Sequence, residues 1–259
     1  MGIIRTDQWL KENLERPLKI CEKLKTYFNG QNPNDIYQQL LHFGMYRPSW
    51  KSRVNLNSMM DYKAWDRVER MFTKYKQKWS GPDIPVFLFP LNQRGGLFAR
   101  KEDKSKGGVS FPDKMFLFLS EYQDEKEIEA LLVHEYHHVC RLQRTNKNHE
   151  DYTLLDSIII EGLAEYAVLK HCGEQYLADW CHMYTEAELE AFWDRYLKPK
   201  LNKRKNERVH DELLFGGRNV PPLLGYAAGY HLVQNFYKNE SYLVKQSFRT
   251  PSSKYLEYR

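Results

Sequence analysis

The sequence predicts an α+β protein that is mostly helical. Apolar side chains recur every three or four residues over long segments at both ends of the chain, whereas the clearest strand-like runs are two short apolar segments near the middle. The 259 residues are 42% hydrophobic and 14% aromatic, which is typical of a globular chain with a sizeable core. We therefore expect several helices and one small sheet.

Helices are expected to dominate the first part of the chain. Residues 7–28 place their apolar side chains on one face and predict a single amphipathic helix. A short helix is predicted over residues 35–43 and a longer one over residues 59–79, with a loop at residues 48–50. No catalytic pattern occurs in residues 1–80, so we expect a helical support region or a wall of the substrate cleft there.

Strand signals follow. Pro85–Pro90 is an apolar run framed by prolines, which suits a strand near the edge of a sheet, and Lys114–Leu119 is a second apolar run. Between them, Gly107–Ser110 fits two structures. It is either an edge strand, on which an extended peptide could pair through main-chain hydrogen bonds, or an ordinary glycine loop.

The next helix carries the most informative motif, H-E-x-x-H, with His134, Glu135 and His138 in its fixed places. Residues four apart lie on one face of a helix, so the two imidazoles can bind one metal ion with Glu135 beside them. A chance match on a core helix is the alternative, but burying these polar groups without a ligand would carry a desolvation cost. We therefore predict a zinc site in which Glu135 accepts a proton from water at the metal.

A third ligand is expected from the following helix, predicted over residues 154–172 with Thr153 as its N-cap. Glu161 follows three isoleucines, which favours an interior position, and a buried carboxylate is costly unless it is paired or bound to metal. Glu165 lies one turn later on the same face and could accept the free N–H of a ligating histidine. The alternative is a surface pair of carboxylates on an amphipathic helix.

These two motifs together resemble a known clan of enzymes. His134-Glu135-x-x-His138 followed by Glu161 and Glu165 looks like the gluzincin metallopeptidases, the thermolysin-like clan, in which the Glu on the second helix is the third zinc ligand. Glu165 stands where thermolysin-like enzymes have Asp. Together with two softer motifs, Gly107-Gly108-Val109 and Gly225-Tyr226-Ala227-Ala228-Gly229-Tyr230, the pattern is similar to the bacterial YjaZ-like family of predicted zinc-dependent proteases.

The resemblance implies a zincin-like metalloprotease fold with its small sheet packed on the active-site helix. It also implies three regions. Residues 1–80 would form the helical support, residues 81–173 the catalytic core, and residues 174–259 a helical C-terminal subdomain that closes the cleft.

The C-terminal part is expected to supply a donor for the oxyanion of the reaction. Residues 176–196 and 223–237 predict helices. In similar gluzincins a Tyr or His of the C-terminal subdomain stabilises the oxyanion. Here we favour Tyr230, with Tyr226 and His231 as alternatives and with ordinary helix packing as the other explanation for both tyrosines.

Composition limits the partners. The net charge of +5 is small, and the basic segment 198–208 lacks interleaved aromatic residues, so we expect a solvated loop and no nucleic-acid binding. No long apolar run predicts a membrane span. The four cysteines are scattered, and the start of the chain does not read as a signal peptide, which together favour a reducing, cytoplasmic setting. The oligomeric state stays open.

The function expected from these observations is zinc-dependent hydrolysis of peptide bonds in a peptide or protein substrate. His134, His138 and Glu161 would bind Zn²⁺, and Glu135 would be the general base. One alternative is a zinc-bound regulatory protein that holds a peptide without turnover. Another is a hydrolase of non-peptide amides.

Overall fold

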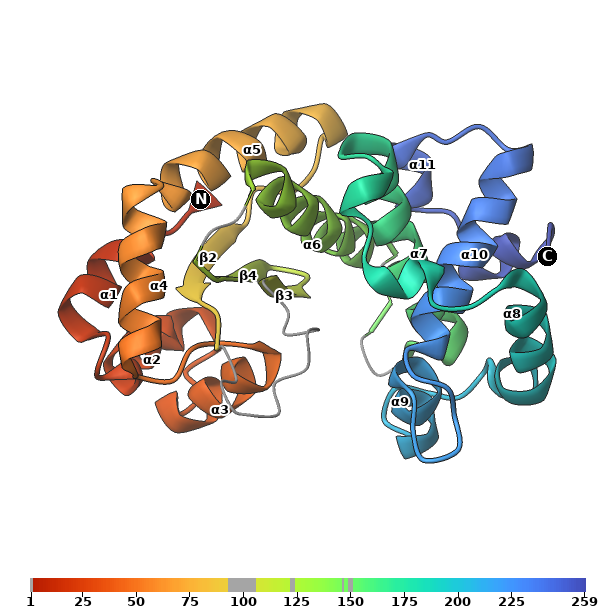
Figure 1. The fold of residues 1–259 in the computed structure, drawn as a ribbon, viewed down its shortest axis with the longest axis horizontal. Helices are drawn as coiled ribbons and strands as arrows, with labels where there is room; N and C mark the ends of the chain where they lie inside the picture. Colours follow the sequence, from red (N-terminus) through yellow and green to blue (C-terminus); the bar gives the residue numbers. More distant parts are fainter. Residues whose placement is uncertain (1, 93–105, 122–123, 146, 149–150) are drawn as a thin grey trace. The chain divides into compact units, whose positions relative to one another are not determined.

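The structure, a computed structural model, describes residues 2–92, 106–121, 124–145, 147–148 and 151–259. It is α+β and mostly helical, as predicted, with one four-stranded sheet in the described residues (Figure 1). Contacts divide the chain into two compact units, residues 1–139 and residues 140–259. The division into three regions stays a prediction.

The first unit begins with helices that differ in part from those predicted. Their bounds are α1 Thr6–Asn13, α2 Pro17–Leu24, α3 Pro33–Phe43, α4 Trp50–Asp61 and α5 Ala64–Trp79. The single helix predicted over 7–28 is wrong, because Pro17 cannot continue a helix from the preceding turn and instead starts α2.

The loop predicted at residues 48–50 is confirmed at residues 48 and 49, whereas Trp50 already begins α4. Ser49 caps this helix in a reciprocal pair of hydrogen bonds with Ser52. The helix predicted over 59–79 is in fact two helices, because the chain turns at Tyr62 and at Lys63, whose φ is 56°. The predicted helix over 35–43 is confirmed, and Gly44 ends it with a φ of 117°.

The sheet confirms both strongly predicted strands. Its strands are β1 Gly2–Ile3, β2 Pro85–Pro90, β3 Lys106–Phe111 and β4 Lys114–Leu119, in the order β1-β2-β4-β3. β2 runs parallel to β1 and β4, while β3 pairs antiparallel with β4, with Val109 opposite Phe116. All six residues of β2 and of β4 are buried. No other described strand pairs with β3, so the glycine segment is an edge strand of the sheet.

Two helices carry the predicted metal-binding residues, α6 Glu125–Thr145 and α7 Leu154–His171. The boundary between the two compact units falls within α6. Asp124 caps α6 by accepting a hydrogen bond from the backbone N–H of Lys126, at 3.1 Å. Thr153 caps α7 in a capping box with Asp156, as predicted.

The rest of the second unit is helical. Short 3₁₀ turns at Glu174–Tyr176 and Asp179–His182 lead to α8 Glu186–Phe192, which continues as a π-helical turn at Trp193–Leu197. The single helix predicted over 176–196 is therefore broken into several short elements. The remaining helices are α9 Arg208–Phe215, α10 Leu224–Asn239 and α11 Val244–Ser247. Among the described helices, none has the length and apolar character needed to cross a membrane.

The core of the second unit forms where α7 packs on α10 (Figure 1). A Cβ atom added to Gly162 would lie 2.2 Å from the backbone oxygen of Gly229, and one added to Gly229 would lie 2.0 Å from the backbone oxygen of Ile158. The two helices therefore meet backbone to backbone at this pair of glycines. Gly162 thus lets α7 and α10 come close.

Candidate metal centre

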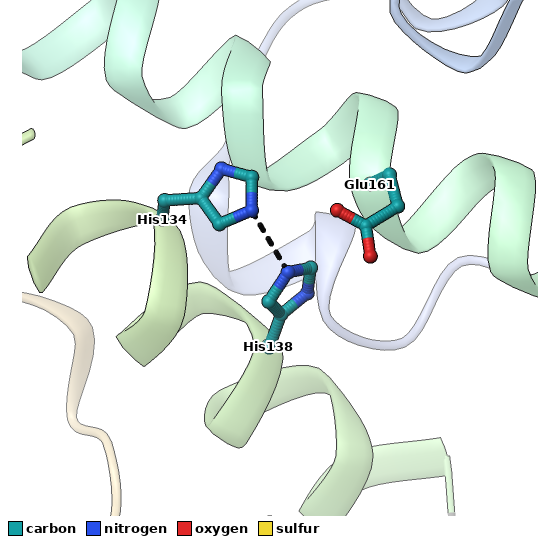
Figure 2. A group of neighbouring side chains, drawn as sticks. All are labelled: His134, His138 and Glu161. Carbon is teal, nitrogen blue, oxygen red and sulfur yellow. Dashed lines mark hydrogen bonds between the residues drawn. The ribbon is translucent and has the colours of Figure 1, made fainter. Parts of the chain in front are cut away.

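The H-E-x-x-H motif lies in the middle of α6, and both histidines project from one face of the helix (Figure 2). The Nε2 atoms of His134 and His138 are 3.0 Å apart. His138 is 8% exposed and His134 is half-buried. The neighbouring His137 is fully buried and lies edge-on to Trp79, as expected for a side chain that points away from the metal-binding face.

Glu161 of α7 completes a group of three side chains that could hold a metal ion. Within the described part of the chain, one ligand atom from each of His134, His138 and Glu161 lies within 4.8 Å of the other two (Figure 2). Two imidazoles and a carboxylate are the donor set of a catalytic zinc site with an open water position. Two nitrogens that share a tetrahedral zinc lie about 3.3 Å apart, close to the separation of the two Nε2 atoms. The donor set fits zinc.

Glu135 is held in place by the edge strand β3. Its side chain is 7% exposed, and its Oε2 accepts a hydrogen bond from the Ser110 hydroxyl at 2.6 Å. Gly108, two residues earlier on the same face of β3, lies against the Glu135 side chain. The sequence indicated that β3 is a possible edge strand but did not indicate this contact.

Glu165 is buried in the second unit. It is 3% exposed, and its Oε1 accepts a hydrogen bond from the backbone N–H of Ala178 at 2.5 Å. The isoleucines that precede Glu161 are buried as expected from the apolar run. The orienting role of Glu165 toward a histidine ligand stays a prediction.

The three candidates for the oxyanion donor lie on α10 in different surroundings. The Tyr226 ring packs edge-on against Trp180, with 5.3 Å between ring centroids. Tyr230 and His231 line a cavity of about 290 Å³. Its other lining residues are Cys181, His182, Tyr184, Glu186, Leu189, Gln234 and Lys238. None of the three metal-binding side chains lines this cavity, and the choice of Tyr230 stays a prediction.

Burial shifts the pKa values of Tyr230 and His231 in opposite directions. Burial raises the pKa of Tyr230 well above its usual value, and the neighbouring Cys181 and Glu165 act in the same direction. Tyr230 therefore keeps its proton at neutral pH and can donate a hydrogen bond. Burial lowers the pKa of His231, which the charge of Glu186 opposes.

Two basic residues of the second unit, Arg141 and Lys205, lie in different surroundings. Arg141 is buried at 2% exposure, and its guanidinium group donates hydrogen bonds to the Ser247 carbonyl and to Ser252 Oγ. Lys205 belongs to the basic segment predicted to be a solvated loop. The structure leaves Lys205 exposed, as that prediction expects.

The donor set is one that could hold a zinc ion. The chain belongs to the family described as "Predicted Zn-dependent protease (DUF2268)", whose model matches residues 64–257. It is 35% identical to uncharacterized protein YjaZ of Bacillus subtilis (strain 168), with 99% of each chain covered.

A more distant relative is uncharacterized protein YjfC of the same organism. It is 25% identical over 130 residues, which cover 47% of this chain and 44% of that protein. No solved structure matches the chain. The resemblance to YjaZ-like proteins inferred from the motifs is confirmed, and with it the description as Zn-dependent.

Proposed function

We propose that the chain is a zinc metallopeptidase of the gluzincin type. One observation carries the proposal, namely that ligand atoms of His134, His138 and Glu161 lie within 4.8 Å of one another. The family description as a Zn-dependent protease supports it.

Each residue has a defined role in the proposed reaction. Zinc, when bound, supplies a Lewis acid that activates water for attack on a carbonyl. Glu135 accepts the proton of the attacking water and delivers it to the leaving nitrogen. Tyr230 donates a hydrogen bond to the developing oxyanion, and Glu165 orients a histidine ligand.

The edge strand β3 supports a peptide as the substrate. An extended peptide can add to a sheet edge through main-chain hydrogen bonds, and β3 is the last described strand of its sheet. Gly108, in the same strand, lies against Glu135. A peptide paired with β3 would therefore run close to the proposed general base.

The test combines metal analysis with peptide cleavage. The purified chain should bind about one zinc ion, and chelation should abolish cleavage of a peptide library, with recovery on addition of Zn²⁺. Glu135→Gln should keep the metal and lower kcat at least about 1000-fold, because it removes the proton acceptor. Glu125→Gln is the matched control, since Glu125 is an exposed glutamate in the first turn of the same helix.

Three outcomes would contradict the proposal. Full activity of Glu135→Gln would exclude Glu135 as the general base. Zinc binding without cleavage of any peptide would favour a regulatory protein that holds a peptide without turnover, and cleavage of non-peptide amides alone would favour an amide hydrolase. The cytoplasmic setting suggested by the cysteines stays part of the proposal.

A further inference from the structure

The Ser110 side chain is placed to control the position of Glu135. Its Oγ lies 2.6 Å from Glu135 Oε2 and 2.8 Å from the Glu135 carbonyl oxygen. A hydroxyl has one proton to donate, and an ionised carboxylate is the stronger acceptor. The Ser110 hydroxyl therefore contacts both the backbone carbonyl and the carboxylate of Glu135. These two contacts restrict the side-chain torsions of Glu135.

The rest of β3 restricts Glu135 further. A Cβ atom added to Gly108 would lie 2.5 Å from Glu135 Oε1 and 2.6 Å from its Cδ and Cγ atoms. The carboxylate of Glu135 thus occupies the space that a side chain at position 108 would fill. Because residues two apart share a face of a strand, Gly108 and Ser110 act on Glu135 from the same side.

A fixed carboxylate matters for proton transfer. A free Glu side chain samples several rotamers, and ordering it costs up to about 2 kcal/mol of conformational entropy. A general base has to lie within hydrogen-bond reach of the group whose proton it takes, about 2.6–3.2 Å between heavy atoms, and misplacement by about 1 Å can lower a rate about 100-fold. Residues that hold the base in advance therefore increase kcat.

We propose that Ser110 is a positioning residue, whose hydroxyl holds the Glu135 carboxylate in the orientation needed for proton transfer. The proposal rests on the proposed role of Glu135 as general base. In this proposal β3 both offers an edge for pairing with a peptide and positions the Glu135 side chain.

The test compares Ser110→Thr with Ser110→Val, two side chains of nearly the same shape that differ in the hydroxyl. Both suit an edge strand. We expect Ser110→Val to lower kcat about tenfold and to leave KM within about twofold, while Ser110→Thr stays within about threefold of the wild type. Bound zinc should remain about one ion per chain in both variants.

A second measurement does not depend on activity. Thermal unfolding of the metal-free chain should give Ser110→Val a Tm about 3 °C below that of Ser110→Thr, because the hydrogen bond to a charged group is lost. In a Glu135→Ala background the two variants should melt within about 1 °C of each other.

The outcomes separate this proposal from the proposed function. Equal kcat in the Thr and Val variants of an active enzyme would overturn the positioning role alone. A rise in KM at constant kcat would overturn it too, since Ser110 would then contact the substrate. If the wild type cleaves nothing, the proposed function fails. The pairing of Ser110 with Glu135 is then tested by stability alone: it would be overturned if Ser110→Val and Ser110→Thr differed in Tm by the same amount in the wild-type and in the Glu135→Ala background.

Discussion

Gly108 in β3 and Gly162 in α7 both make room for a close contact, but with different consequences. An added Cβ at Gly108 would meet the outer atoms of the Glu135 side chain, which can rotate away. At Gly162 it would meet the backbone of Gly229, which cannot move unless α7 and α10 separate. The first glycine should therefore matter for the position of a reactive group and the second for the stability of the fold.

Two buried carboxylates, those of Glu135 and Glu165, differ in a similar way. Glu135 accepts a hydrogen bond from the side chain of Ser110, whereas Glu165 accepts one from the backbone N–H of Ala178. A backbone donor depends on the path of the chain and survives most substitutions. A side-chain donor depends on one residue type, so the surroundings of Glu135 are the more sensitive to single substitutions.

The largest effect is expected for Gly162→Ala. The added methyl carbon would overlap the backbone of Gly229, so we expect a loss of about 3 kcal/mol or more in the free energy of unfolding. Urea denaturation measures this loss. Gly217→Ala is the matched control, because its nearest neighbours would lie at 3.5 Å, an ordinary contact. Equal stability of the two variants would remove the contrast between the two regions.

Arg141→Met comes next and tests whether the stability of the second unit depends on buried polar contacts as well. The substitution leaves the Ser247 carbonyl and Ser252 without their donor, while Ser252 also donates to Asp156 at 2.7 Å. We expect a loss of about 2–3 kcal/mol in the free energy of unfolding. Arg208→Met, at a side chain that is 92% exposed, should change it by less than about 0.5 kcal/mol.

Gly108→Ala should affect catalysis instead of stability. Displacement of the Glu135 carboxylate should lower kcat about 30-fold, or about 2 kcal/mol in activation free energy, with the Tm within about 2 °C of the wild type. Gly107→Ala is the neighbouring control, since its Cβ would have its nearest contacts at 3.5 Å. A large loss of stability in Gly108→Ala, with kcat unchanged, would contradict the comparison.

The smallest effect concerns Glu129, which lies on α6 away from β3. Burial alone would raise the pKa of Glu129, but hydrogen bonds from Lys126, Lys74 and Tyr75 lower it to about 2. Since the pKa is lower in the folded chain, this stabilisation is present above about pH 4.5 and is lost as the pH falls toward about 2.

The expected contribution of Glu129 is about 1–2 kcal/mol, because Lys74 and Lys126 are half exposed and screened by solvent. Urea denaturation at a series of pH values should show a shallower acid loss of stability in Glu129→Gln. An unchanged pH dependence would mean that these hydrogen bonds add nothing to the folded state.

By itself, the sequence determined the features that depend on neighbours along the chain. The placement of His134 and His138 on one face follows from the helical repeat, and the caps of α6 and α7 follow from side chains within three residues of the helix start. The two apolar strands are local patterns as well. Glu161 was also within reach, because an acidic residue in an isoleucine run needs a partner.

Only the tertiary structure decided what the functional side chains contact. Ser110 and Glu135 are separated by 25 positions, and Arg141 and Ser247 by 106, and no periodicity encodes such pairs. The same limit explains the wrong helix over 7–28, where the apolar spacing continues through Pro17 although the hydrogen bonding does not. Local pattern thus predicted the metal-binding residues, while packing between distant segments determined how Glu135 is held.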